Sequence, residues 1–132
     1  MSDPYADIHD VVIQFVDESE ESLNEVTNLA ISLNSSSDNR EEIDYIFRIL
    51  HTIKGNAAVL GFLKVKEIAH ILEESIESIR SGSRVIDDRF LDVFIKGSDL
   101  MIRMFGDIRE SMSEGNDREY VDFIDRTAKL KQ

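Results

Sequence analysis

The chain has 132 residues, 42% of them hydrophobic, which is enough to bury the core of one ordinary domain. Its formal net charge is -12, with 27 Asp and Glu against 15 Lys and Arg, which argues against nucleic acid and anionic membranes as partners. It has no cysteine, which excludes disulfides, thiolate metal sites and a cysteine nucleophile. No secretory signal pattern or membrane-spanning apolar run is visible, so we expect one cytoplasmic, monomeric domain over residues 1–132.

The apolar spacing is helical almost throughout and predicts five helices and no sheet. The first helix is expected to begin near Asp3 and Pro4, with Asp3 as its N-cap, and to end at the polar loop 34–38. Its expected buried stripe consists of Ile8, Val12, Phe15, Ser19, Ser22, Val26, Leu29 and Leu33.

The second and third helices are expected to form a hairpin with a very short turn. The second begins after Asp38 or Asn39 and is ended by Gly61, because glycine readily adopts the left-handed conformation that closes a helix. The third runs from about 63 to 81, with Gly82 closing it. The residues expected to be buried are Ile43, Ile46, Phe47, Leu50, Ile53 and Ala57 on the second helix and Val65, Ile68, Ala69, Leu72, Ile76 and Ile79 on the third.

Asp87 and Asp88 are expected to start a fourth helix, and a short fifth helix follows the loop 113–116. Their expected inward residues are Phe90, Val93, Phe94, Gly97, Leu100, Met101, Met104 and Ile108, then Tyr120, Phe123 and Ile124. Four long amphipathic helices joined by short loops predict an all-α fold, an antiparallel up-down four-helix bundle with an additional C-terminal helix.

His51 is the residue around which the second helix is organised. At about 100° per residue it lies roughly 120° from the centre of the buried stripe, so it flanks the core and reaches solvent. Gly55 and Ala58 follow on the same edge, and a glycine inside a helix costs about 1 kcal/mol relative to alanine. We interpret this low surface as clearance for a partner, with Gly55, Ala58 and Arg48 as candidate docking residues.

The hairpin places a second helix beside His51. If the turn is centred near Phe62, position 51 faces position 73 and position 54 is level with position 70. A set of four polar residues is therefore expected on one outer edge: His51, Lys54, His70 and Glu73. Because the loop geometry fixes this register only to about one turn, Glu74 and Glu77 remain alternative partners.

This set suits a phosphoryl acceptor. A neutral imidazole attacks through one nitrogen, while a carboxylate that accepts a hydrogen bond from the other N–H fixes the tautomer and raises the basicity of the ring. Lys54 would stabilise the negative charge that phosphorylation adds. The sequence lacks a phosphate-binding glycine loop and a Walker lysine, so we expect no ATP, cofactor or metal site here and no catalysis by this domain alone.

The spacing His51-x-x-Lys54-Gly55-Asn56-Ala57-x-x-Leu60-Gly61-Phe62, followed by His70-x-x-Glu73, resembles the histidine-containing phosphotransfer (HPt) domain family. Among its members the chain is most similar to the N-terminal P1-type domain of the chemotaxis-type histidine kinase. The resemblance covers nearly the whole chain, including the acidic first helix around Phe15-Val16-Asp17-Glu18-Ser19.

The resemblance implies that His51 is phosphorylated, that Glu73 is its hydrogen-bond partner and that Lys54 and His70 give polar support. Gly55 would give a partner room. It also implies two partners in a two-component, chemotaxis-like relay. One is an ATP-binding histidine kinase domain as donor, and the other is a response regulator whose aspartate, with bound magnesium, accepts the group.

Three alternatives remain open. The chain could be a stand-alone phosphorelay HPt protein or a structural or adaptor bundle. It could also be a metal-binding bundle, since His51, His70 and Glu73 offer three ligands. Metal sites in bundles normally use inward-facing Glu and His, however, whereas these residues are expected on an outer flank.

Overall fold

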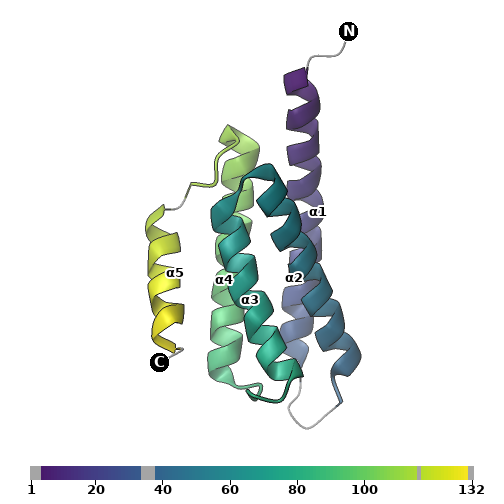
Figure 1. The fold of residues 1–132 in the computed structure, drawn as a ribbon, viewed down its shortest axis with the longest axis vertical. Helices are drawn as coiled ribbons and strands as arrows, with labels where there is room; N and C mark the ends of the chain where they lie inside the picture. Colours follow the sequence, from purple (N-terminus) through teal and green to yellow (C-terminus); the bar gives the residue numbers. More distant parts are fainter. Residues whose placement is uncertain (1–3, 34–37, 116, 131–132) are drawn as a thin grey trace.

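The computed structural model describes residues 4–33, 38–115 and 117–130. Within these ranges it contains five helices and no strand: α1 (Pro4–Ser32), α2 (Arg40–Leu60), α3 (Leu63–Arg80), α4 (Asp88–Ser111) and α5 (Asp117–Leu130). Helices α1 to α4 run alternately up and down and form a four-helix bundle, and α5 lies outside it (Figure 1). The predicted all-α bundle with an additional C-terminal helix is confirmed.

The helix ends follow the sequence signals where the structure describes them. The Asp87 side chain accepts a hydrogen bond from the Phe90 N–H at 2.9 Å and caps α4. Gly61 has a φ of 84° and ends α2 as predicted, which turns the chain sharply into α3. The predicted N-cap Asp3 lies outside the described residues.

The buried faces match the predicted stripes on α2, α3 and α4 in most positions. On α2, for example, Ile46, Leu50 and Ala57 are fully buried. The prediction was wrong for Ile8, which is 56% exposed, because the start of α1 projects beyond the end of the other helices (Figure 1). It also missed Leu23, which is buried because α1 packs against both α2 and α4 and so hides more than one stripe.

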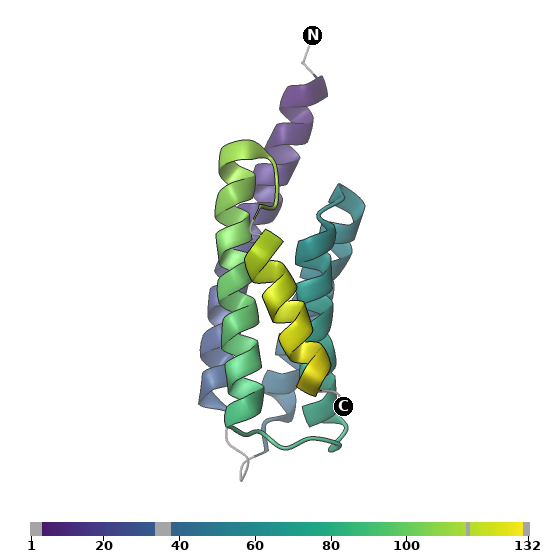
Figure 2. The same ribbon diagram turned by 90° about the vertical axis from the view of Figure 1, so that its left-hand side faces the viewer.

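The α2–α3 hairpin positions the predicted site. These two helices share the most extensive contact in the bundle, and the short turn at Gly61 fixes their register. Helix α5 crosses obliquely over α4 and α3 (Figure 2). It approaches closely at Gly97, where a Cβ atom would lie 2.9 Å from Leu72 and 3.0 Å from Phe123.

None of the helices in the described part of the chain has the length and apolar character needed to cross a membrane.

Candidate functional site

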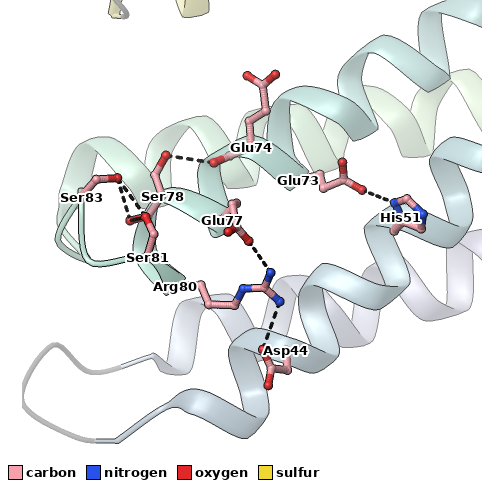
Figure 3. Close-up of polar contacts among 9 residues, drawn as sticks. All are labelled: Asp44, His51, Glu73, Glu74, Glu77, Ser78, Arg80, Ser81 and Ser83. Atoms are coloured by element: carbon pink, nitrogen blue, oxygen red, sulfur yellow. Dashed lines mark hydrogen bonds and ion pairs between the residues drawn. The ribbon is translucent and has the colours of Figure 1, made fainter.

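His51 lies midway along α2, on the edge that faces α3, and its side chain is 64% exposed. Its Nδ1 atom is 2.7 Å from the Oε2 atom of Glu73, which comes from the middle of α3 (Figure 3). The ring is therefore bonded to the neighbouring helix through Nδ1, and Nε2 takes no part in that hydrogen bond.

Glu73 is the buried member of the pair, since the residue is only 7% exposed. Its second oxygen, Oε1, accepts a hydrogen bond from the Lys54 ammonium group at 2.6 Å. Burial raises the pKa of the Glu73 carboxyl, but the hydrogen bonds from Lys54 and His51 outweigh it, so the pKa is lowered overall. Glu73 is consequently ionised at neutral pH.

An ionised carboxylate only accepts hydrogen bonds, so the bond to His51 requires a proton on Nδ1. When the imidazole is neutral and Nδ1 carries the proton, Nε2 is the ring nitrogen with the in-plane lone pair that can attack an electrophile. The buried carboxylate thus selects one tautomer of His51 and orients its nucleophilic nitrogen away from α3. This arrangement is suited to group transfer through Nε2.

The register predicted from the hairpin is confirmed for positions 51 and 73. Of the alternatives, Glu77 pairs with Arg80 at 2.8 Å, and Glu74 lies next to His70. The expectation that Glu73 lies on the outer edge of the helix pair, away from the buried stripe, was wrong as to its burial, however. Its side chain is covered in the groove between α2 and α3, where Lys54 and His51 hydrogen-bond both of its oxygens.

His70 does not join the other three residues. Its Nε2 atom lies 3.0 Å from Glu74 on its own helix, at the i,i+4 spacing at which helical side chains meet. Lys54 was expected level with His70, but its ammonium group reaches Glu73 instead. The reason is that a buried carboxylate attracts a cation more strongly than a half-exposed imidazole does. The predicted four-residue set is therefore a triad of His51, Lys54 and Glu73.

The three predicted docking residues share the exposed side of α2 with His51. Arg48, Gly55 and Ala58 are all exposed. A Cβ atom added at Gly55 would meet nothing within 4 Å, so the fold itself does not require a glycine there. The absence of an intramolecular constraint agrees with the interpretation that Gly55 leaves room for a partner.

Phe47 is a residue whose place in the site the sequence did not reveal, because it was expected only as part of the buried stripe. It is half-buried, and its ring stacks on that of His51 with centroids 6.1 Å apart and planes 10° apart. The i,i+4 spacing of Phe47 and His51 was the available signal. Arg80 lies over the same phenyl ring, with its guanidinium carbon 4.5 Å from the centroid.

The metal-binding alternative finds no support in the geometry. Among the described residues, no group of three or more His, Asp or Glu side chains is arranged to hold a metal ion. His51 and His70, two of the three hypothetical ligands, each bond a different glutamate.

Comparison with known proteins points to a family. The family model described as the Hpt domain matches residues 10–114. The chain is 33% identical over 90 residues to the chemotaxis protein CheA of Halobacterium salinarum, which covers 68% of this chain and 14% of that protein. It is 30% identical over 95 residues to CheA of Salmonella typhimurium, covering 72% of this chain and 14% of that protein.

Two solved structures share the fold. The solution structure of the histidine phosphotransfer domain of CheA superposes with a TM-score of 0.77 and 29% identity, covering 88% of this chain and 87% of that one. The crystal structure of the phosphorylated P1 domain of CheA3 in complex with CheY6 from R. sphaeroides gives a TM-score of 0.74 with 22% identity, covering 92% and 98%. The second likeness concerns the fold alone.

Proposed function

The chain belongs to the Hpt domain family, and we propose that within this family His51 is the residue that receives the phosphoryl group and passes it on. The observation that carries this proposal is the hydrogen bond between His51 and the buried, ionised Glu73, which leaves Nε2 as the nucleophile. The same histidine begins the His51-x-x-Lys54-Gly55 spacing that carries the family resemblance, and His9 lies outside the residues 10–114 that the family model matches.

The transfer step follows from the tautomer. The Nε2 lone pair attacks the γ-phosphorus of ATP, the N–P bond forms, and the bond from phosphorus to the β,γ-bridging oxygen breaks. ADP leaves with that electron pair. The proton remains on Nδ1, so the phosphorylated ring is cationic and is stabilised by the Glu73 carboxylate 2.7 Å away. In the second step a carboxylate oxygen of the acceptor attacks phosphorus, and the electron pair of the N–P bond returns to Nε2.

Lys54 acts mainly through Glu73. Its ammonium group donates a hydrogen bond to Oε1 of Glu73, and its side chain is only 23% exposed. It therefore offsets the charge of the carboxylate, while Oε2 accepts the hydrogen bond from His51. Because Lys54 is one helical turn from His51, its charge also stabilises a phosphoryl group on the ring.

The phosphoryl donor and the phosphoryl acceptor are both expected to be domains other than this one. The aligned segment makes up about one-seventh of the CheA relatives, at 14% of their length. We infer that an ATP-binding histidine kinase domain is the donor and that the aspartate of a response regulator, with its magnesium ion, is the acceptor. The relatives are named chemotaxis proteins, and the P1 domain of the same fold is phosphorylated and bound to CheY6. These names support a chemotaxis-type relay.

Labelling by a chemotaxis-type kinase domain with radiolabelled ATP tests the proposal. Wild-type chain is expected to become labelled, His51→Gln to remain unlabelled, and the matched control His70→Gln to be labelled at close to the wild-type rate. Retention of label in His51→Gln, or its loss in His70→Gln alone, would overturn the assignment of His51.

A further inference from the structure

We propose that Phe47 is a positioning residue for His51 and that Arg80, from the end of α3, holds Phe47 in place. The inference rests on the proposed function, since it concerns how the nucleophile is oriented. It assigns a task to two side chains outside the triad of His51, Lys54 and Glu73.

One hydrogen bond does not fix the His51 ring. The bond to Glu73 anchors Nδ1, but with 64% of the side chain exposed the plane of the imidazole can still tilt and displace Nε2. Such motion would be costly for transfer, because a misplacement of about 1 Å can reduce a reaction rate by roughly 100-fold. A second contact on the ring face is therefore needed.

Phe47 supplies that contact from one turn earlier on α2. Its ring is nearly parallel to the imidazole, at 10°, with a centroid separation of 6.1 Å, which lies within the range of offset stacking. The hydrogen bond fixes a point of the imidazole and the stack fixes its plane. Together they leave one direction for Nε2.

Phe47 in turn is held from α3. The guanidinium carbon of Arg80 lies 4.5 Å from the Phe47 centroid, in the range of a cation–π contact. Arg80 is itself placed by carboxylates on both helices, Asp44 of α2 at 3.3 Å and Glu77 of α3 at 2.8 Å (Figure 3). A continuous set of contacts therefore runs from this ionic bridge through Phe47 to His51.

His70 offers a comparison with His51, because it has a carboxylate partner but no stacked ring among the described residues. Its Nε2 atom lies 3.0 Å from Glu74. The partner of its imidazole is half-exposed and lies on the same helix.

The kinetic test uses the 132-residue chain as substrate of a chemotaxis-type kinase domain with ATP. Phe47→Leu keeps an apolar side chain but removes the ring, and we expect kcat to fall about tenfold with KM unchanged. Phe47→Tyr keeps the ring and should restore kcat to within about twofold of wild type. A rise in KM with unchanged kcat in Phe47→Leu would show a docking residue instead and would overturn the proposal.

The second test asks whether Arg80 acts through Phe47, and it needs no kinase. The ring current of Phe47 shifts the proton resonances of the His51 imidazole, so Arg80→Met should move those resonances although neither aromatic residue is changed. Arg103→Met, which removes a guanidinium of α4 that pairs with Glu119 of α5, is the matched control and should leave them in place. Unmoved His51 resonances in a folded Arg80→Met variant would overturn the role of Arg80.

The two tests also separate this inference from the function it rests on. If wild-type chain accepts no phosphate while Arg80→Met still moves the His51 resonances, the proposed function fails and the positioning contact stands. If wild type is labelled and Phe47→Leu matches it in kcat, the positioning role fails and the function stands. Circular dichroism and the melting temperature of each variant show that it is folded.

Discussion

The α2–α3 edge around His51 and the seam between α4 and α5 both join two helices through charged side chains, yet they differ in burial. In the seam, Arg103 pairs with Glu119 and Arg126 with Asp92, and the four side chains are 45% to 58% exposed. At the α2–α3 edge the Glu73 side chain is 10% exposed and is shared by His51 and Lys54. The seam pairs its charges in water, whereas the edge confines a buried carboxylate between two donors.

The difference explains why only one of the two regions is expected to do chemistry. Exposed ion pairs are screened by solvent and contribute about 0.2–1 kcal/mol each, with little control of orientation. A buried carboxylate must be satisfied by hydrogen bonds, and those bonds fix the protonation state and direction of whatever donates them. We infer that the burial of Glu73 fixes the tautomer of an otherwise exposed histidine and so leaves its Nε2 free to act as a nucleophile.

Removing one carboxylate from each region, Glu73 from the α2–α3 edge or Glu119 from the seam, should give the largest difference in the rate of phosphoryl transfer. Glu73→Ala removes the group that holds the proton on His51 Nδ1, and we expect the rate of phosphoryl transfer to fall roughly 100-fold. Glu119→Ala removes a carboxylate from the seam and should leave the rate within about twofold. Initial labelling rates with a kinase domain and ATP measure both. Equal rates for wild type and Glu73→Ala would contradict the role of the carboxylate.

A bulky side chain at Gly55 should have the next largest effect. Gly55→Leu is expected to slow transfer to and from partner domains about tenfold, because it fills the low surface next to His51. The isolated chain should become more stable by about 1 kcal/mol, since leucine favours a helix over glycine by that amount and the position is open. Urea unfolding measures stability and labelling measures transfer. A variant that transfers at the wild-type rate would show that partners do not approach this edge.

The pH dependence of the free energy of unfolding should show the contribution of the buried Glu73 carboxylate. The pKa of Glu73 is lower in the folded chain than the 4.5 of a free glutamate side chain, so its ionised form stabilises the fold. This contribution is fully present above pH 4.5 and is lost as the pH falls through the lower pKa of the folded state. Urea unfolding of wild type and Glu73→Gln at several pH values should therefore show curves that converge in acid. A constant difference between them would contradict the stabilised carboxylate.

The smallest effect is expected in the seam. Arg103→Met should change the free energy of unfolding by less than about 1 kcal/mol, with a difference from wild type that shrinks as salt is added, because the pair with Glu119 is exposed. Urea unfolding at low and high salt checks this. A loss of several kcal/mol would show that the seam, like the α2–α3 edge, depends on a specific charge contact.

The sequence predicted the backbone of the site better than its side chains. Helical spacing and the glycine at position 61 were sufficient to set the α2–α3 register, and with it the pairing of His51 with Glu73. Both signals are local, and a short turn leaves two antiparallel helices little freedom to slide. The same signals could not show that Glu73 is buried, because burial depends on the rotation of α3 against α2.

The side-chain contacts that were missed have the same physical origin. Arg80 reaches from α3 to Phe47 on α2, and His70 turns to Glu74 rather than to Lys54. Each of these side chains has several polar or aromatic residues within one turn of it, so spacing along the chain does not decide which one it contacts. The projecting start of α1, where Ile8 is exposed, depends on relative helix lengths in three dimensions.

We infer that Glu73 makes Nε2 of His51 the phosphoryl acceptor, and nitrogen NMR of the phosphorylated chain can distinguish the two ring nitrogens. With ¹⁵N-labelled histidine, we predict phosphorus on Nε2 of His51 and a proton retained on Nδ1, hydrogen-bonded to Glu73. Phosphorus on Nδ1, or on the imidazole of His70, would overturn the assignment of Nε2 of His51 as the acceptor.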